Sequence, residues 1–538
     1  MLFWAFHKKL TVRNVYLLLF SLFFYYKSGG LYFGLLLLST IVDYWCGNAI
    51  HKSNDQVRRK AILVLSLCVN LGLLAFFKYS GYFVGLINDA FGTGFKPLNF
   101  MAVFANNFFG SNFDINEIIL PVGISFYTFQ TLSYTIDIYR RELEPTKSIV
   151  DFGFFVTFFP QLVAGPIVRA ADFIPQIYKK FSLNREQFGI ALYLILAGLF
   201  KKTVISDYIS VNFVDRVFDD PNLYSGFSNL MAVYGYSIQI YCDFSGYSDM
   251  AIGLAALLGF QLPLNFNSPY KSVSITDFWR RWHISLSSWL RDYLYISLGG
   301  NRKGKVRTYI NLMITMLLGG LWHGAATKFI IWGGLHGGAL ALHKMWRESF
   351  WKFLRVVSII SALIGVYLVG VHPLVTNIMG GFSSEVTPWF GQTAGLGIGL
   401  LVVGAFLFAL TYFIKEEHLP ALEIPNALAA VFTFHFVAFC WIYFRAQSVE
   451  KVKLMLSRIF YDFNLSGVGQ RLSEYREVMA LIVLGFVIHF IPKRWKEAVK
   501  TSLVTMPDFA KVLVCAVVIF ICYQAKTADV QPFIYFQF

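Results

Sequence analysis

The chain has 538 residues, of which 56% are hydrophobic and only 14% are charged, and its net charge is +15. A typical soluble protein carries roughly 25% charged residues, so this composition excludes a soluble multidomain enzyme and indicates a polytopic helical membrane protein. The basic residues form short clusters between apolar runs. That pattern is typical of cytoplasmic loops and excludes a separate nucleic-acid-binding domain.

Apolar runs recur along the whole chain. A membrane-spanning helix needs about 20 mostly apolar residues. The runs lie at residues 12–27, 30–50, 60–88, 119–138, 151–168, 187–213, 228–260, 308–322, 328–346, 353–376, 390–414, 426–444, 475–491 and 508–524. Several are interrupted, so we expect an all-α protein with about 11 spans, in a range of about 10 to 13, plus short re-entrant or interfacial helices. Residues 89–118 predict a loop with short helices. We find no repeat or linker, so residues 1–538 are expected to form one membrane domain.

The segment FFPQLVAGPIVRAADFIPQ, residues 158–176, ends one apolar run and contains three prolines. Proline breaks the helical hydrogen-bond ladder, and a broken backbone at membrane depth is tolerated only when it is buried or lines a cavity. This segment therefore predicts a re-entrant turn or a helix end near a binding site.

A polar stripe crosses the next long apolar run. In QIYCDFSGYSD, residues 239–249, Gln239, Asp243 and Tyr247 follow one another at intervals of four, so they share one helix face. A carboxylate buried in a bilayer needs a cationic or hydrogen-bonding partner. Arg280 and Arg281 are available partners, and a structural salt bridge is the simplest interpretation of Asp243.

The segment SITDFWRRWHISLSSWLRDYLYISLGG, residues 274–300, predicts one amphipathic helix. Its apolar stripe contains Phe278, Trp282, Trp289 and Tyr293. Ser274 and Asp277 have the spacing of a capping box, which predicts a helix start near residue 275. The arginines exclude a lipid-facing position. The helix lies either at the interface, anchored by tryptophan, or inside the protein, with His283 facing a cavity.

The run LLGGLWHGAATKFIIWGGLHG, residues 317–337, contains two histidines framed by glycine. Ionisable groups within membrane segments are costly, so each is a functional candidate. His323 and His336 are 13 positions apart, which is about 220° around a straight helix. They can act together only if the helix breaks near residues 325–328. The alternative is that the histidines form interhelical hydrogen bonds and the glycines allow close helix packing.

Several long stretches together resemble the membrane-bound O-acyltransferase (MBOAT) family. These stretches are residues 120–140, 158–176, 238–270, 277–304, 319–337, 439–448 and 532–538. The resemblance is to the bacterial branch that includes alginate O-acetylation (AlgI-type) and D-alanyl transfer (DltB-type) proteins, and it is closest to the AlgI type. It implies tilted helices around a central funnel, with residues 261–346 as the catalytic region.

The resemblance also implies roles for individual residues. His323 matches the family's catalytic histidine, and His283 matches the other strongly shared one. The expected supporting residues are Asp243, Trp282, Arg280, Arg281, Trp322, His336 and Tyr247. Histidine, with an unperturbed pKa of about 6.5, suits base catalysis of acyl transfer from a thioester to a hydroxyl. The glycines beside His323 are then interpreted as clearance for the substrates. No metal-binding motif occurs, and no metal is expected.

The expected function is transfer of an acyl group, acetyl in the AlgI type, from a cytoplasmic thioester to an exported cell-envelope polysaccharide. The donor is acetyl-CoA or an acyl carrier protein thioester, and no bound cofactor is expected. Basic residues could attract the donor phosphates, although loop topology alone would also explain them. These residues are Arg280, Arg281, Arg302, Lys303, Lys305 and Arg307.

The expected location is the bacterial cytoplasmic (inner) membrane, as a multi-pass protein in contact with lipid. The expected partners are an extracytoplasmic SGNH-type acyltransferase or a small membrane protein, and the polysaccharide synthesis and export machinery. Two alternatives stay open. One is transfer of D-alanine or another acyl group to teichoic acid or another envelope glycan, and the other is a non-catalytic transporter or scaffold.

Overall fold

The computed structural model describes residues 3, 8–348, 350–371, 397–409, 424–525 and 533. Most of these residues are helical, and no β-strand occurs among them. The first helices are α2 (Leu10–Gly29), α3 (Phe33–Lys52), α4 (Gln56–Phe91), α5 (Phe100–Phe109), α6 (Ile124–Arg140), α7 (Ile149–Thr157), α8 (Phe159–Leu162), α9 (Ala170–Ile177), α10 (Arg185–Phe200) and α11 (Asp215–Asp219). The central helices are α12 (Gly226–Leu257), α13 (Ile275–Arg281), α14 (Ile284–Trp289), α15 (Lys305–His323), α16 (Thr327–Glu348) and α17 (Phe350–Val366).

The last described helices are α20 (Asn426–Arg445), α21 (Val449–Tyr461), α22 (Val468–Glu474), α23 (Arg476–Phe490), α24 (Lys493–Thr505) and α25 (Asp508–Ala525). Four π-helical segments join or extend these helices: η2 (Lys201–Asp207), η3 (Ser210–Val214), η6 (Leu290–Tyr295) and η7 (Tyr367–Val371). Such π-helical turns are rare in proteins and occur often at functional sites. Here η6 continues α14 in the middle of the predicted catalytic region.

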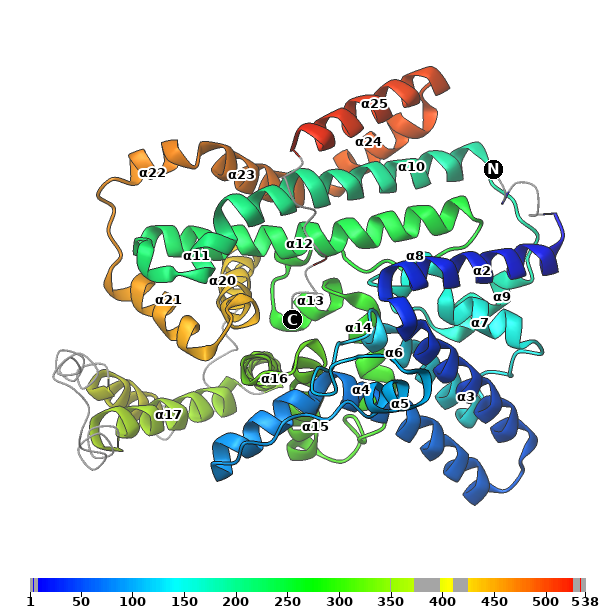
Figure 1. Ribbon diagram of the computed structural model, residues 1–538. Coiled ribbons are helices and arrows are strands. Elements are labelled where there is room, and N and C mark those ends of the chain that lie inside the picture. Colours follow the sequence, from blue (N-terminus) through cyan, green and yellow to red (C-terminus); the bar gives the residue numbers. More distant parts are fainter. Residues whose placement is uncertain are drawn as a thin grey trace.

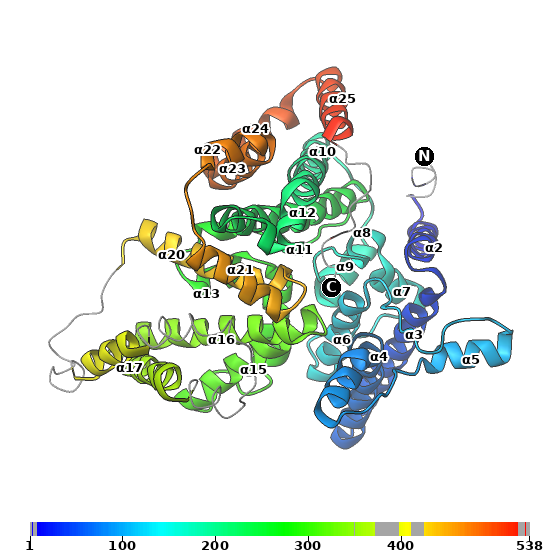
Figure 2. The same ribbon diagram turned by 60° about the vertical axis from the view of Figure 1, so that its left-hand side comes forward.

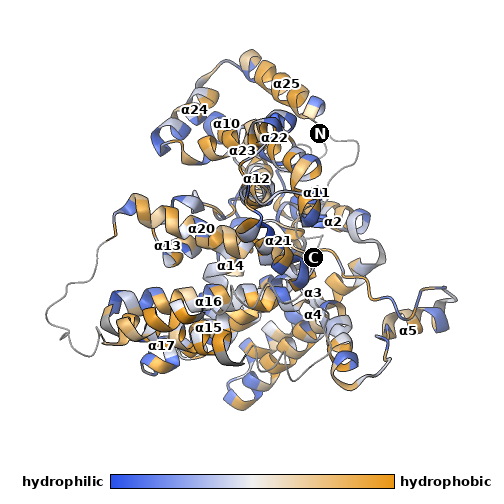
Figure 3. Ribbon diagram, turned by 90° about the vertical axis from the view of Figure 1, so that its left-hand side faces the viewer, coloured by the Kyte–Doolittle hydropathy of each residue, from blue (hydrophilic) through white to orange (hydrophobic). Residues whose placement is uncertain are grey.

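Five helical segments in the described part of the chain are long and apolar enough to cross a membrane, or six if the bent pair α23 and α24 is counted as one span. They are Phe33–Lys52, Gln56–Phe91, Arg185–Asp219, Asn426–Arg445 and Asp508–Ala525. Figure 3 shows hydrophobic residues along the outer helices α17 and α25, as expected for surfaces in lipid. The chain is therefore a helical membrane protein, but a count of about 11 spans is not confirmed.

Two predicted spans differ from simple helices. The run at 151–168 divides at Phe158 into α7 and α8, and Pro160 lies in the first turn of α8. The predicted proline-broken segment is thus confirmed, and its residues from Pro160 to Ala170 are almost all buried. The runs at 353–376 and 390–414, and the terminal stretch 532–538, lie partly outside the described residues.

The segment from α13 to η6 lies in the middle of the molecule. In Figures 1 and 2, α13 lies between the long helix α12 and the hairpin of α15 and α16. Helix α10 runs along α12 on the far side, and α20 crosses beside α13. The aromatic residues Phe278, Trp282 and Trp289 of this segment are buried, which decides in favour of the inside position predicted as one of two alternatives.

Glycines bring α15 and α16 into close contact. A Cβ at Gly320 would lie 2.2 Å from the carbonyl oxygen of Phe329, and a Cβ at Gly333 would lie 2.3 Å from that of Met316. A Cβ at Gly324 would lie 2.0 Å from the Phe329 ring. These glycines serve helix packing. Our interpretation of the glycines beside His323 as clearance for substrates is wrong, because α16 fills that space.

Candidate functional site

The predicted helix at 274–300 begins as expected but does not continue. Ser274 caps α13, since its hydroxyl accepts the amide of Asp277 at 3.2 Å. The helix then ends at Trp282, and His283 has a left-handed backbone with φ of 43°. The Ile284 amide donates to the carbonyl of Asn265 at 2.9 Å instead of continuing the helix. The prediction of one continuous helix is wrong, because a hydrogen bond to a distant segment replaces the local ladder.

His283 is fully buried, and Asn265 orients its ring. The Asn265 Oδ1 atom accepts the backbone amide of Ser285 at 3.2 Å and its hydroxyl at 2.9 Å. Because this atom is an acceptor, Nδ1 of His283, 3.2 Å away, is the atom that donates to it. The proton on Nδ1 leaves Nε2 with a lone pair. Among the described residues, Nε2 has no hydrogen-bond partner.

We expect selective ¹⁵N NMR of the histidines to show the Nδ1-protonated tautomer for His283. The His283 signals are assigned as those that disappear in the His283→Gln variant. Asn265→Leu should abolish this preference. It should also lower the free energy of unfolding by about 1–3 kcal/mol, because buried groups of His283 and Ser285 lose their acceptor. Asn265→Asp replaces the amide oxygen with a carboxylate oxygen, which is also an acceptor, and should retain the tautomer. An Nε2-protonated His283 in the parent protein would contradict this assignment.

His323 is the last residue of α15 and is only 4% exposed. Its ring lies among three aromatic rings, with centroid distances of 4.9 Å to Trp322, 5.0 Å to Trp332 and 5.2 Å to Phe444. The ring of Trp322 is in turn 6.1 Å from that of His283. Helix ends that are 40 positions apart in the chain thus bring the two predicted histidines close to one tryptophan.

His336 belongs to the same cluster. The helix ends at His323 and restarts at Thr327, so the break that the two histidines would need in order to act together is present. Trp332 then contacts both histidines, since its ring centroid is 4.6 Å from that of His336. Nδ1 of His336 accepts a hydrogen bond from Trp279 Nε1 at 3.3 Å. His336 therefore packs against two tryptophans of the cluster.

The predicted supporting residues around α13 have different positions. Trp282 is buried against Trp441, with ring centroids 4.9 Å apart. Arg281 pairs with Asp277 on its own helix at 2.9 Å. Arg280 is exposed. Neither arginine is an ion-pair partner of Asp243, so that prediction is wrong.

Asp243 pairs instead with a lysine of η2. Lys202 contacts Asp243, which is 2% exposed, and is 2.8 Å from Asp207. Lys201 beside it pairs with Asp249 at 2.5 Å. The predicted salt bridge exists, and the partner differs because α10 and η2 lie against α12 where α13 does not. Tyr247, the third residue of the stripe, packs its ring 5.2 Å from Phe533.

A cavity of about 760 Å³ lies between α13 to η6 and the α15–α16 hairpin. Leu290, Leu312 and Met316 contribute apolar lining, while Arg280 and Arg347 are exposed and cationic. The cavity therefore has an apolar part and a cationic surface, a combination that suits a ligand with an apolar arm and anionic groups.

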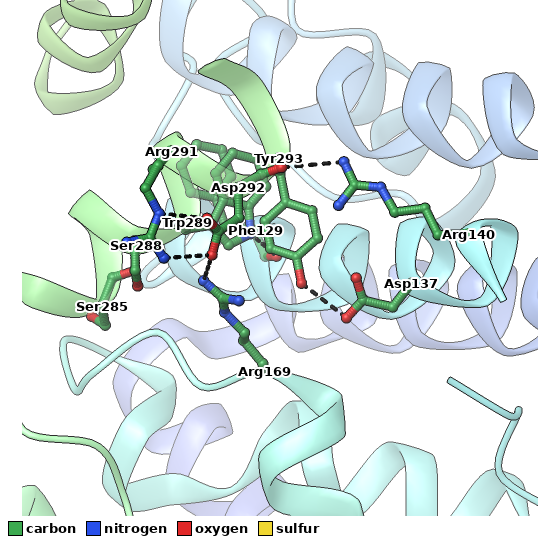
Figure 4. A network of polar contacts seen from close by, with 10 residues as sticks. All are labelled: Phe129, Asp137, Arg140, Arg169, Ser285, Ser288, Trp289, Arg291, Asp292 and Tyr293. Carbon is green, nitrogen blue, oxygen red and sulfur yellow. Dashed lines mark hydrogen bonds and ion pairs between the residues drawn. The ribbon is translucent and has the colours of Figure 1, made fainter. Parts of the chain in front are cut away.

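A second cavity of about 830 Å³ lies beside it and has a polar lining. Figure 4 shows its central network, in which Asp292 accepts Arg169 at 2.6 Å and Arg291 at 2.6 Å. Burial alone would raise the pKa of Asp292, but the hydrogen bonds from Arg291 and Arg169 outweigh it and lower that pKa. Tyr293 donates to Asp137 at 2.9 Å in the same view.

Arg302 also lines this polar cavity, and it is one of the predicted phosphate-binding residues. Of the other five, Arg280 lines the 760 Å³ cavity, whereas Arg281, Lys303, Lys305 and Arg307 line neither cavity. In the described part of the chain, no cluster of three or more His, Cys, Asp or Glu side chains is arranged to hold a metal ion.

Two residues near the histidines, Asn265 and Lys78, were not predicted from the sequence as part of the site. Lys78 of α4 donates to the carbonyls of Trp322 at 2.5 Å and His323 at 3.3 Å, so it caps the end of α15. A signal was present for Lys78, because a lysine in the interior of the apolar run at 60–88 is the same kind of intramembrane charge as the histidines. Asn265 had no such signal, because it lies in a loop.

The sequence pattern of the MBOAT family (membrane-bound O-acyltransferase family) matches residues 140–384. The chain is 43% identical over 334 residues to a probable alginate O-acetylase AlgI of Pseudomonas syringae, covering 62% of this chain and 61% of the relative. It is 39% identical over 375 residues to a peptidoglycan O-acetyltransferase of Helicobacter pylori, covering 65% and 68%. It is 29% identical over 246 residues to a teichoic acid D-alanyltransferase of Bacillus subtilis, covering 43% and 61%. The aligned region thus covers less than two thirds of the length of the Pseudomonas syringae relative and of the Bacillus subtilis relative.

Proposed function

Because this chain belongs to the membrane-bound O-acyltransferase family, we propose that it transfers an acyl group, most simply acetyl, to an exported cell-envelope polysaccharide. The donor is a cytoplasmic thioester, acetyl-CoA in the simplest case. Transfer is direct or passes through an extracytoplasmic SGNH-type transferase or a small membrane partner. The similarity to an alginate O-acetylase and a peptidoglycan O-acetyltransferase supports acetyl as the group and a glycan as the acceptor.

The observation that carries the proposal is the pair of buried histidines whose rings both lie close to that of Trp322. In the proposed reaction His323 takes the proton of the acceptor hydroxyl as its oxygen attacks the thioester carbonyl. The carbon–sulfur bond then breaks, and the departing thiolate recovers that proton from the imidazolium. A histidine suits both steps, since it accepts and returns a proton near neutral pH. His283, with its lone pair on Nε2, would hold the reacting groups in place.

The 760 Å³ cavity supports a route for the donor. Its lining includes Thr315 and Met316, which precede His323 by about 10 Å along α15. The exposed Arg280, Arg291 and Arg347 would attract the phosphates of CoA, and the apolar part would take the pantetheine arm. Basic loops favour the cytoplasmic side of the membrane, which supports the bacterial inner membrane as the location.

One alternative has its own support. The 29% identity to a teichoic acid D-alanyltransferase favours D-alanyl transfer from a carrier protein as a second candidate. Genes for a carrier protein and its ligase beside this gene would favour that reaction. Genes for polysaccharide synthesis and export and for an SGNH-type transferase would favour O-acetylation.

The purified protein in lipid nanodiscs, supplied with radiolabelled acetyl-CoA and an envelope oligosaccharide, should release one thiol for each acetyl group transferred or hydrolysed. Mass spectrometry of exported glycan should show O-acyl groups only in cells that express the gene. Thiol release from a D-alanyl carrier but not from acetyl-CoA would replace the proposal by its alternative. Unchanged glycan acylation together with no thiol release from either donor would contradict both.

A further inference from the structure

A third cavity, of about 420 Å³, lies at the opposite end of the α15–α16 hairpin from the 760 Å³ cavity. Its lining includes Ala325 and Ala326, which form the turn directly after His323, and Phe329 in the first turn of α16. His323 therefore lies between two cavities along α15. One is lined by residues that precede it and the other by residues that follow it.

Three cations from three different helices line this third cavity. They are Lys78 of α4, Lys328 of α16 and Arg445, the last residue of α20. None of the ten described lining residues carries a carboxylate. Arg445 pairs with Asp215 at 2.5 Å outside the lining, which offsets one of the three charges. A cavity of this size with a net positive lining attracts anions.

The three cations are held in place by the protein. Lys328 donates to the carbonyl of Ala446 at 2.6 Å, and Lys78 donates to that of Trp322 at 2.5 Å. Each lysine thus caps the C-terminal end of a helix and cannot withdraw from the cavity without losing that contact. Nε of Arg445 is buried and has no hydrogen-bond partner among the described residues. In addition, the first turn of α16 lines the cavity, and a helix N-terminus favours negative charge.

We propose that this cavity is an anion-binding site for the acyl acceptor, and that it takes a carboxylate of an acidic sugar. Two observations connect it with the acceptor. It lies beyond His323 on the side away from the cavity proposed for the donor, and Arg445 follows Phe444, whose ring is 5.2 Å from that of His323. A carboxylate bound between the three cations would hold the sugar beside the turn that directly follows His323. The assignment of the bound anion to the acyl acceptor rests on the proposed function, whereas the presence of an anion-binding site does not.

The test is equilibrium binding to the full chain in nanodiscs without any acyl donor, with a uronic acid trisaccharide as the probe. Its carboxyl-reduced counterpart has the same sugar rings without the charge. The parent protein should bind the acidic form at least about tenfold more tightly, and Lys328→Gln and Lys78→Gln should each remove most of that preference. Lys271→Gln is the matched control, because Lys271 also caps a helix end, at the carbonyl of Ile491 at 2.9 Å, away from the cavity.

Equal affinity of the parent protein for the two trisaccharides would overturn the proposal even if no variant folds. An acidic preference unchanged in both lysine variants would overturn it too. Tighter binding of glycerol phosphate than of the uronate would assign the site to a phosphate group, such as that of a lipid headgroup or a teichoic acid. That result would overturn the proposal that the site binds a carboxylate. Because no donor is present, these outcomes are independent of thiol release, which tests the proposed function.

Discussion

Replacing His323 with glutamine is expected to lower kcat for acetyl transfer by about 10²–10⁴-fold, the usual contribution of a general base. Glutamine occupies a similar volume between Trp322, Trp332 and Phe444, but it cannot accept the proton of an acceptor hydroxyl. KM for acetyl-CoA should change little, because the cavity proposed for the donor is lined by other residues. Thiol release and labelled product, measured across donor concentrations, give the two constants separately.

His51→Gln is the control for this experiment, because His51 is exposed at the end of α3, away from the aromatic cluster. Its kinetics should match those of the parent protein. The variant His283→Gln, measured in the same way, shows which of the two histidines acts as the base. Full activity in His323→Gln with complete loss in His283→Gln would transfer the role of base to His283. Full activity in both variants would exclude base catalysis by either histidine.

Replacing Lys202 with methionine should lower the free energy of unfolding by about 3–5 kcal/mol, because it leaves two carboxylates without their cation inside the protein. Asp243 is 2% exposed, and Asp207 lies 2.8 Å from the lysine nitrogen. The apolar part of methionine preserves most of the packing of the lysine chain. Chemical or thermal unfolding in detergent, followed by tryptophan fluorescence, measures the change.

The double variant Lys202→Met/Asp243→Asn should recover part of this loss, since it removes one of the two uncompensated charges. Lys500→Met is the matched control, because Lys500 pairs with Glu497 on the more exposed helix α24. Such a surface pair contributes about 0–1 kcal/mol. A loss in Lys202→Met no larger than in Lys500→Met would show that the buried pair has no special role in stability.

The aromatic cluster shows how far the sequence could predict the site. The glycine-framed run at 317–337 indicated both histidines and showed that they could act together only across a helix break, because charge in an apolar run and helical periodicity are local properties. The capping box at Ser274 also predicted its helix start. Whether His323 and His283 lie near each other could not be derived from spacing, because they belong to separate helices. Only the resemblance to known acyltransferases connected them before the structure did.

The wrong predictions all concern contacts between distant segments. The helix at 274–300 is interrupted because Asn265 binds His283 and Ile284, and its own sequence contains no helix breaker at that point. Asp243 pairs with Lys202 because η2 lies against α12, a fact of helix packing. The glycines of α15 were assigned to substrate clearance because the sequence does not show that the backbone of α16 packs directly against them.

The sequence by itself determined that this is a helical membrane protein, which runs are apolar, where several helices begin or break, and which ionisable groups lie in apolar surroundings. These features depend on composition and on residues within a few positions of one another. Only the tertiary structure decided which tautomer His283 has, which cations line the cavity beyond His323, and which lysine neutralises Asp243. Those features depend on how helices pack. For example, Lys78 donates a hydrogen bond to the carbonyl of Trp322, which is 244 positions away in the chain. A contact between residues so far apart cannot be predicted from a local sequence pattern.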